Sequence, residues 1–348
     1  MMTPKLGVRV RVLVVDDSAF ARKVLREVIS AHPDLEVVGI ARDGVDALEQ
    51  IESLKPDVVT LDLVMPELDG VAVLQSLQQR SDAPAVVVVS MADDQSELGI
   101  AALRAGAFDI VHKPTALALD RLYQLSDELT AKILEASRSK RSPSGESERP
   151  AASNEALVAT RTTLVVIGAS TGGPQALTRL IHALPANFPV PVAIVLHMPP
   201  GYTEAFARRL DDDCALDVME ARDDLPLRAG LVIVARAGLH LKLRGDGRAW
   251  HAQLDISPTD SLHRPSVDVL FQSAAEIAKA GTLGVVLTGM GSDGKIGSGA
   301  IRAAGGRVLT ESESSCVVYG MPRTVVEAGF SNAQSPIGGM AALITKYL

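Results

Sequence analysis

Four apolar runs in the first third of the chain each end at side chains that could take part in phosphoryl chemistry. Three carboxylates brought together repel one another, and a hard divalent cation with oxygen ligands, such as Mg²⁺, relieves that repulsion. One carboxylate could then attack a phosphoryl group while the metal, a hydroxyl and an ammonium neutralise the developing charge. In chain order, the residues that end these runs are Asp16 with Asp17, Asp62, Ser90 and Lys113.

Three further runs in the second half of the chain end near a serine, a histidine and an aspartate. Ser170 lies in the glycine-rich turn GASTGGP, where the N-terminus of a following helix would present N–H groups to an oxyanion. A serine nucleophile needs a base, and the base needs an orienting carboxylate. His197 directly follows one run, and Asp293 lies in the loop TGMGSDG. The order Ser, His, Asp differs from that of α/β-hydrolases, so another scaffold is expected.

Each of these positions also has an ordinary structural interpretation. A dinucleotide site would need GxGxxG, whereas the turn around Ser170 reads GASTGG. Taken singly, His197 could end a strand and Asp293 could cap a helix. Asp268, in the segment HRPSVD, is the rival for the orienting carboxylate.

The polar residues of the first set can meet only if the runs before them form one sheet. Apolar runs and helix-like segments alternate there, which predicts a doubly wound parallel sheet with its strands buried on both faces. The carboxyl ends of such strands form one ligand crevice. The predicted strands are 10–15, 35–40, 57–61, 85–89 and 109–111, and the predicted helices are 19–30, 44–54, 70–79, 96–105 and 119–136.

A polar segment follows the first domain, which is expected to span residues 1–136. Residues 137–161 are rich in Ser, with Pro and charges of both signs, and cannot bury a core, so they predict a flexible linker. The second domain, 162–348, resumes the alternation around a middle with more β-structure, where Gly245-Asp246-Gly247 indicates a hairpin. Its predicted strands are 164–167, 192–196, 283–287 and 307–309, and its helices are 174–184, 203–210, 265–279 and 295–304, followed by closing helices.

Composition excludes several classes of protein. Lys and Arg number 34 against 42 Asp and Glu, a net charge of −8, which argues against binding to a nucleic-acid backbone. Cys214 and Cys316 are isolated, which fits a reducing compartment without disulfides or structural zinc. No signal-peptide pattern is present, and no apolar run approaches the roughly 18–20 residues that span a bilayer. We therefore expect a cytoplasmic monomer with no membrane insertion.

The first domain resembles the receiver domain of bacterial response regulators. The segments that carry the resemblance are VLVVDDS, LDLVMPELDG, VVVVS and VHKP, each at the expected strand end. The resemblance implies a flavodoxin-like fold in which Asp62 accepts the phosphoryl group. It also implies that Asp16, Asp17 and Asp62 hold Mg²⁺, and that Ser90 and Lys113 contact the phosphoryl group.

One position departs from many receivers. They carry an aromatic residue three positions before the lysine, where this chain has Ile110, with Phe108 two residues earlier. Transmission of the signal by a turning ring is therefore not expected.

The second domain resembles the chemotaxis-type protein-glutamate methylesterases, the CheB family. Five segments carry the resemblance: GASTGGPQAL, VLHMPPGYT, HRPSVDVLF, VVLTGMGSDG and CVVYGMPR. It implies a Rossmann-like fold in which Ser170 attacks the γ-methyl ester of glutamate on the cytoplasmic helices of a chemoreceptor. His197 would be the base, Asp293 its orienting acid, and the Met290 backbone N–H an oxyanion donor. Thr171 and Arg264 would be further oxyanion or substrate contacts.

The resemblance also implies products, partners and regulation. Methanol leaves, water releases glutamate, and deamidation of receptor glutamines is the natural second activity; no cofactor is expected for ester hydrolysis. A histidine kinase of the chemotaxis type would phosphorylate the receiver, which in its unphosphorylated state would restrict access to Ser170. Three alternatives remain: a generic serine esterase under receiver control, a catalytically silent docking module, and a receiver coupled to DNA binding.

Overall fold

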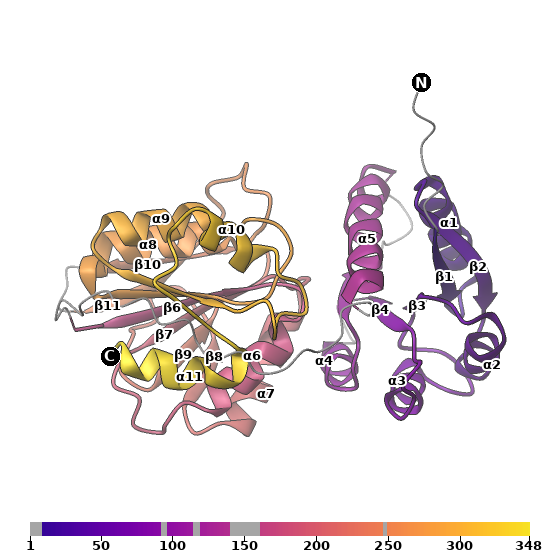
Figure 1. Ribbon diagram of the computed structural model, residues 1–348, viewed down its shortest axis with the longest axis horizontal. Coiled ribbons are helices and arrows are strands. Elements are labelled where there is room, and N and C mark those ends of the chain that lie inside the picture. The colour runs from indigo at the N-terminus through magenta and orange to yellow at the C-terminus, as the bar shows by residue number, and fades with distance from the viewer. Residues whose placement is uncertain (1–8, 92–95, 114–118, 140–160, 246–248) are drawn as a thin grey trace. The chain divides into compact units, whose positions relative to one another are not determined.

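The computed structural model describes residues 9–91, 96–113, 119–139, 161–245 and 249–348 (Figure 1). The chain divides into two compact units, Met1–Pro143 and Ser144–Leu348, and each is described by itself. The boundary falls inside the segment predicted as a linker, of which residues 140–160 lie outside the described part of the chain. Among the described residues, no helix combines the length and apolar character that a bilayer crossing requires.

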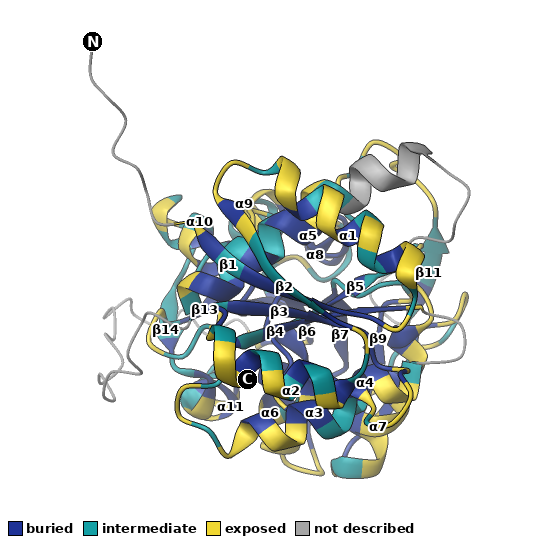
Figure 2. Cartoon of the chain, turned by 90° about the vertical axis from the view of Figure 1, so that its right-hand side faces the viewer, coloured by how far each residue is buried: buried dark blue, intermediate teal, exposed yellow. Residues whose placement is uncertain are grey.

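The first unit is a five-stranded sheet in the order β2-β1-β3-β4-β5, with every neighbouring pair parallel. Its strands consist largely of buried Val, Leu and Ile, which confirms the predicted doubly wound class. Helices α1 and α5 pack on one face and α2, α3 and α4 on the other (Figure 2). The strands are β1 (Val10–Val15), β2 (Leu35–Ala41), β3 (Val58–Leu61), β4 (Ala85–Ser90) and β5 (Asp109–His112). The helices are α1 (Ala19–Ala31), α2 (Gly44–Leu54), α3 (Gly70–Gln78), α4 (Ser96–Arg104) and α5 (Leu119–Ser139).

Local hydrogen bonds start these helices close behind the strand ends. The Ser18 hydroxyl accepts from the backbone of Ala21 at the start of α1, 3.4 Å away. The Asp69 carboxylate accepts from the Ala72 N–H at the start of α3, 2.8 Å away. Such caps satisfy N–H groups that the helix itself leaves free. Short loops therefore carry the polar residues at the carboxyl edge of the sheet.

The second unit is a seven-stranded sheet in the order β14-β13-β12-β6-β7-β9-β8, again with every neighbouring pair parallel. This confirms the predicted second parallel α/β domain. The strands are β6 (Leu164–Ala169), β7 (Val192–Leu196), β8 (Asp217–Glu220), β9 (Leu231–Val234), β12 (Thr282–Val286), β13 (Arg307–Glu311) and β14 (Ala333–Ser335). Strands β10 (His240–Gly245) and β11 (Trp250–Asp255) form the antiparallel hairpin expected in the middle of this domain; its turn, 246–248, is outside the described residues.

Helices α8, α9 and α10 lie on one side of this sheet and α6, α7 and α11 on the other (Figure 2). Gly168 in β6 lets α8 approach closely, because a Cβ at that position would lie only 3.1 Å from Val267 Cβ. Helix α8 is the element that carries the N-terminal groups of the site described below. The helices are α6 (Gly173–His182), α7 (Tyr202–Asp213), α8 (Val267–Ala278), α9 (Lys295–Ala303), α10 (Met321–Glu327) and α11 (Ile337–Lys346), with a short 3₁₀ turn at Lys279–Gly281.

Candidate functional site

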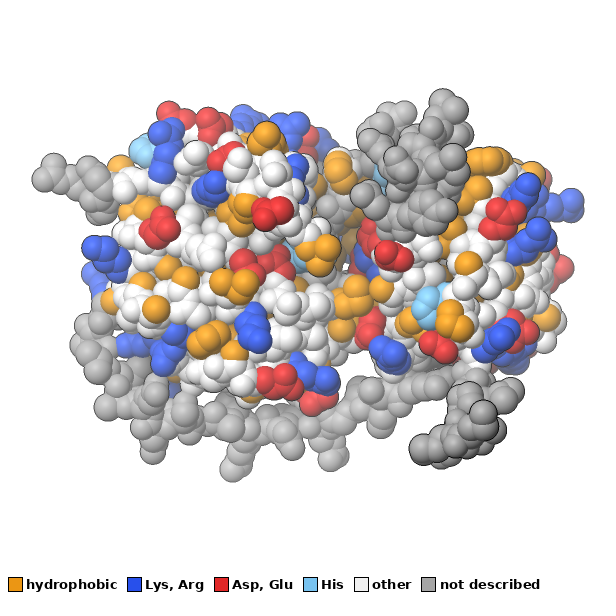
Figure 3. All heavy atoms as spheres, turned by 90° about the horizontal axis from the view of Figure 1, so that it is seen from above, with side chains coloured by type: hydrophobic (Ala, Val, Ile, Leu, Met, Phe, Trp, Pro, Cys, Tyr) orange, Lys and Arg blue, Asp and Glu red, His pale blue; other side chains and the backbone are white. Residues whose placement is uncertain are grey.

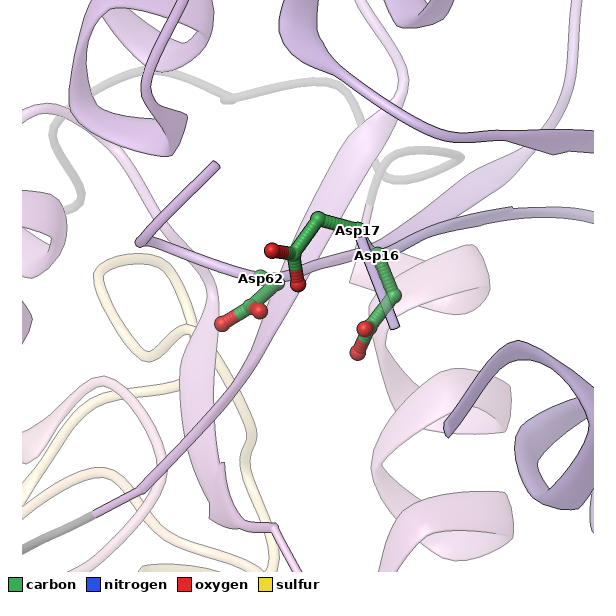
Figure 4. A group of neighbouring side chains, drawn as sticks. All are labelled: Asp16, Asp17 and Asp62. Atoms are coloured by element: carbon green, nitrogen blue, oxygen red, sulfur yellow. The ribbon is translucent and has the colours of Figure 1, made fainter. Parts of the chain in front are cut away.

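Three carboxylates meet at the carboxyl edge of the first sheet. Asp16 and Asp17 follow β1, and Asp62 follows β3, the strand paired with β1. One oxygen from each carboxylate lies within 4.8 Å of the others (Figure 4). Asp16 and Asp62 are buried, whereas Asp17 is exposed. Carboxylate oxygens are the donors that a hard divalent cation prefers, so this group fits Mg²⁺.

Lys113 supplies a positive charge to the same group. Its ammonium nitrogen lies 2.7 Å from Asp16 Oδ2 and 2.8 Å from Asp62 Oδ2. Burial acts to lower the pKa of Lys113, but the hydrogen bonds and charges of both aspartates outweigh it and hold that pKa above its ordinary value. Burial raises the pKa of Asp16 in spite of the lysine. One ammonium thus faces three carboxylates, so the group keeps an excess of negative charge.

Ser90 and Lys113 are neighbours at this edge. Ser90 ends β4 and is fully buried, and its backbone oxygen accepts from the Lys113 N–H at 2.8 Å. The structure therefore gathers all five residues that the sequence predicted for this site.

Ile110 is buried in β5, with 1% of its surface exposed. Lys132 of α5 donates to the Ile110 backbone oxygen at 2.7 Å and forms ion pairs with Asp109 and Glu128. The strand end is therefore held by a half-buried lysine, at the position where many receivers carry an aromatic ring.

Ser170 lies at the centre of the carboxyl edge of the second sheet. It follows β6, which lies between β12 and β7. Its N–H donates to Thr288 O at 3.0 Å, and its carbonyl accepts from the Gly173 N–H at 2.6 Å. Gly172, with φ +77°, makes the turn into α6. A Cβ on Gly289 would lie 2.8 Å from Ser170 Cβ, so only glycine lets this loop come so close.

His197 and Asp293 form a hydrogen-bonded pair beside Ser170. The distance from His197 Nε2 to Asp293 Oδ2 is 2.9 Å. His197 Nδ1 is buried and has no hydrogen-bond partner among the described residues. The acid therefore holds Nε2, whereas in serine proteases the acid holds Nδ1. Within the described part of the chain, no hydrogen bond joins Ser170 Oγ to the imidazole.

The N-terminus of α8 holds the Asp293 carboxylate. The oxygens accept from the backbone of Val267 at 2.7 Å, the backbone of Asp268 at 2.9 Å and the Ser266 hydroxyl at 2.9 Å. Burial acts to raise the pKa of Asp293, but His197 and these N–H groups outweigh it and hold that pKa well below its ordinary value. Asp293 is therefore an anion that the start of α8 holds in place, with one oxygen hydrogen-bonded to His197.

Asp268, the rival acid, forms no hydrogen bond with His197 among the described residues. Its Oδ1 accepts from the Gly297 N–H at 2.7 Å, at the start of α9. Burial raises the pKa of Asp268 to about 6, and the nearby charge of Asp293 adds to that rise. The geometry therefore pairs His197 with Asp293 and gives Asp268 a helix-capping contact.

Three residues near this pair were not singled out from the sequence, although two of them lie in the segment HRPSVD. The His263 ring stacks on His197, with centroids 4.2 Å apart and planes inclined by 24°. Ser266 starts α8 and gives its hydroxyl to Asp293 instead of to its own helix. Fully buried His240 accepts from the Ser266 N–H at 3.3 Å and donates to Pro258 O at 3.0 Å. The weak sequence signal was a histidine and a serine beside Arg264 and Asp268.

The other predicted oxyanion and substrate contacts, Met290, Thr171 and Arg264, differ in their burial and in their hydrogen bonds. Met290 is half-buried, and its N–H makes no hydrogen bond to any residue that the structure describes. Thr171 is buried, and its carbonyl accepts from the Thr288 hydroxyl at 2.9 Å. Arg264 donates to Thr259 O at 3.2 Å and forms no hydrogen bond with the described atoms of Ser170, the histidine or Asp293. Met290 thus presents an unused backbone donor within the described part of the chain.

Comparison with known proteins gives two family matches. The family described as CheB methylesterase matches residues 165–344, and the family described as response regulator receiver domain matches residues 12–125.

Whole-chain relatives agree with these matches. A protein of Myxococcus xanthus named protein-glutamate methylesterase/protein-glutamine glutaminase 5 is 57% identical over 341 residues, covering 97% of this chain and 98% of that one. A protein of Symbiobacterium thermophilum with the same name, without the number, is 43% identical and covers 99% of both chains. The crystal structure of the Thermotoga maritima CheB methylesterase catalytic domain is 40% identical with a TM-score of 0.53, covering 54% of this chain and all of that one (100%).

Proposed function

Because this chain belongs to the CheB methylesterase family and carries a receiver domain before the catalytic domain, we propose that it is a phosphorylation-activated protein-glutamate methylesterase. It hydrolyses glutamate γ-methyl esters on chemoreceptors and deamidates receptor glutamines, which provides sensory adaptation in chemotaxis. The observation that carries the catalytic part is the 2.9 Å hydrogen bond between His197 and Asp293 at the edge where Ser170 lies.

The reaction begins when Ser170 Oγ turns toward His197 and attacks the ester carbonyl. Its proton passes to His197 Nδ1, and the Oγ–C bond forms as the carbonyl electrons move to oxygen. Asp293 holds the Nε2–H and stabilises the imidazolium, while the Met290 N–H donates to the oxyanion. Because Asp293 is already an anion fixed by α8, this stabilisation needs little reorganisation during the reaction.

The tetrahedral intermediate then collapses. The bond to the methoxy oxygen breaks, His197 returns its proton to that oxygen, and methanol leaves an acyl group on Ser170. Water then attacks with His197 again as the base, and glutamate is released. A glutamine side chain follows the same path with ammonia as the leaving group. Thr171 is held beside the nucleophile by its hydrogen bond to Thr288, and Arg264 is the further contact that the substrate would use.

In the receiver, Asp62 is the phosphoacceptor and a histidine kinase of the chemotaxis type is the phosphodonor. Asp16, Asp17 and Asp62 would hold Mg²⁺, which supplies charge neutralisation when bound. On phosphorylation, the Lys113 ammonium leaves the carboxylates of Asp16 and Asp62 and pairs with the new phosphoryl oxygens. The Ser90 hydroxyl contacts the same oxygens. Phosphorylation then relieves the restriction that the receiver imposes on Ser170.

Receptor cytoplasmic helices are the substrate, which places the protein in the cytoplasm. Nucleic acid is not a partner: the net charge is −8, and on the face seen in Figure 3 Lys and Arg are interspersed with Asp and Glu. The chain acts as a monomer.

Substrate choice is the test of this function against a generic serine esterase under receiver control. The full chain is given methylated receptor membranes and, separately, a small ester such as p-nitrophenyl acetate, each with and without a small-molecule phosphodonor and Mg²⁺. Phosphodonor-stimulated methanol release from the membranes is the expected result. Turnover of the small ester without methanol release would favour the generic esterase.

A further inference from the structure

A buried carboxyl group lies beneath the loop that supports the nucleophile. Glu311 is the last residue of β13, and 1% of its surface is exposed. Its Oε2 accepts from the Thr288 N–H at 2.8 Å, and its Oε1 accepts from the Ser315 hydroxyl at 2.8 Å. A buried acidic group survives only where such donors satisfy it. Burial nevertheless raises the pKa of Glu311, so its neutral form is favoured relative to a carboxyl in water.

Thr288 connects this carboxyl group to Ser170. The Thr288 carbonyl accepts from the Ser170 N–H at 3.0 Å, and its hydroxyl donates to Thr171 O at 2.9 Å. The same hydroxyl accepts from the Val318 N–H at 3.0 Å. One threonine thus ties the nucleophile turn to the segment around Val318, and Glu311 fixes the N–H of that threonine.

The two residues after Thr288 are Gly289, which packs against the nucleophile, and Met290, which supplies the proposed oxyanion donor. Gly289 packs against Ser170 Cβ, and its carbonyl accepts from the Met321 N–H at 2.8 Å. Met290 follows with its unused N–H. A shift at Thr288 would therefore move the backbone of Ser170 and the oxyanion donor together.

We propose that Glu311 is a positioning residue for the hydrolysis: by accepting from Thr288, it sets the distance between the Ser170 hydroxyl and the Met290 N–H. This inference rests on the proposed function, because it takes Ser170 as the nucleophile. Misplacing reacting groups by about 1 Å costs on the order of a hundredfold in rate. A group that only filled the core would affect stability without changing the reactivity of the serine.

The test compares Glu311→Ala with Glu311→Gln in the full chain. The amide oxygen of Gln can accept from the Thr288 N–H, and the Ser315 hydroxyl can turn to accept from the amide NH₂. Three quantities are measured: the rate at which a fluorophosphonate labels Ser170, kcat and KM for methanol release, and thermal unfolding followed by Trp250, the chain's one tryptophan. Ser170→Ala is the labelling control, and Ser315→Ala removes a second donor to the carboxyl, beside the Cys316 thiol, without touching Thr288.

Glu311→Ala is expected to lower the labelling rate and kcat together, by roughly ten- to a hundredfold, with KM little changed. Glu311→Gln and Ser315→Ala are expected to stay within about threefold of the parent chain. The proposal is overturned if folded Glu311→Ala labels as fast as the parent, or if Glu311→Gln is as impaired as Glu311→Ala.

The labelling rate also separates this inference from the proposed function. If the parent chain labels at Ser170 but releases no methanol from receptor membranes, the proposed substrate is wrong while the positioning role is still decided by labelling. If fluorophosphonate does not label Ser170 in the parent chain at all, both the proposed function and the positioning role of Glu311 are wrong.

Discussion

The imidazole of His263 lies face to face with that of His197, at a centroid distance of 4.2 Å. His197 is therefore held on two sides, by Asp293 at its Nε2 and by a ring over its face. A stacked ring opposes rotation about the His197 side-chain torsions and so keeps Nδ1 in one orientation. The residues that hold the base come from the loop before α8 and the loop before α9, far apart in sequence.

The first prediction concerns this stacked pair. Aromatic stacking contributes about 0.5–1.5 kcal/mol, so His263→Ala should lower kcat roughly two- to tenfold. His263→Phe retains a ring at the same place and should recover most of that loss. Initial rates of methanol release at saturating receptor measure both variants. Equal impairment of Phe and Ala would show that the ring face is not what matters.

The second prediction separates the two acids. Asp293→Asn should lower kcat by about 10⁴-fold, because the amide no longer fixes the histidine tautomer or stabilises the imidazolium. Asp268→Asn should leave kcat within about threefold, since its oxygen can still accept from the Gly297 N–H. Single-turnover rates on methylated receptor provide the comparison. Loss in the Asp268 variant with retention in the Asp293 variant would reverse the two roles.

The third prediction is a pH dependence of stability. The folded-state pKa of Asp268 is about 6, above its ordinary value of 3.8, so the native state binds this proton more tightly. The stability gained from that proton is present below about pH 4 and is lost as pH rises through 6. Asp268→Asn resembles the neutral form, so its Tm should match the parent chain near pH 4 and exceed it at pH 7.

Trp250 fluorescence follows this transition in the second unit alone, because the chain has a single tryptophan. The matched control is Asp260→Asn, a nearby aspartate in the same unit outside the hydrogen-bond set of Asp293. A Tm difference for Asp268→Asn that is the same at both pH values would contradict the assignment.

The fourth prediction concerns the cation. Asp17 is the exposed member of the acidic group, so Asp17→Asn should weaken Mg²⁺ binding without disturbing the ion pair of Asp62 and Lys113. Phosphorylation of Asp62 by a small-molecule phosphodonor should then require at least tenfold more Mg²⁺, and a chelator should abolish it. Labelling of Ser170 by fluorophosphonate should be unaffected. An unchanged Mg²⁺ requirement would remove Asp17 from the metal site.

Much of the fold could be predicted because its strands are continuous buried runs. β1, β7 and α2 match their predicted bounds, and most other predicted elements differ by only a few residues. Strands β8 and β14 were not predicted individually, since one carries acids at both ends and the other is the three-residue AQS. Helix α8 begins two residues later than expected, because the backbone of Ser266 is still extended, with φ −113° and ψ 137°.

The site could be predicted in part for the same reason. Residues that follow parallel strands must share an edge, which was enough to group Ser170, His197 and Asp293. Neither the ring nitrogen that faces the acid nor the partner of Asp268 follows from a pattern, because both depend on how α8 enters the edge. Glu311 could not be found either: it ends an ordinary strand, and its role depends on a contact with Thr288, 23 residues earlier in the chain.

The most direct measurement is methanol release from methylated receptor membranes by the phosphodonor-treated full chain, compared with Ser170→Ala in the same assay. Stimulated release is expected from the parent chain and none above the uncatalysed rate from Ser170→Ala, with both chains folded by Trp250 fluorescence. Release by Ser170→Ala at the parent rate would show that Ser170 is not the nucleophile.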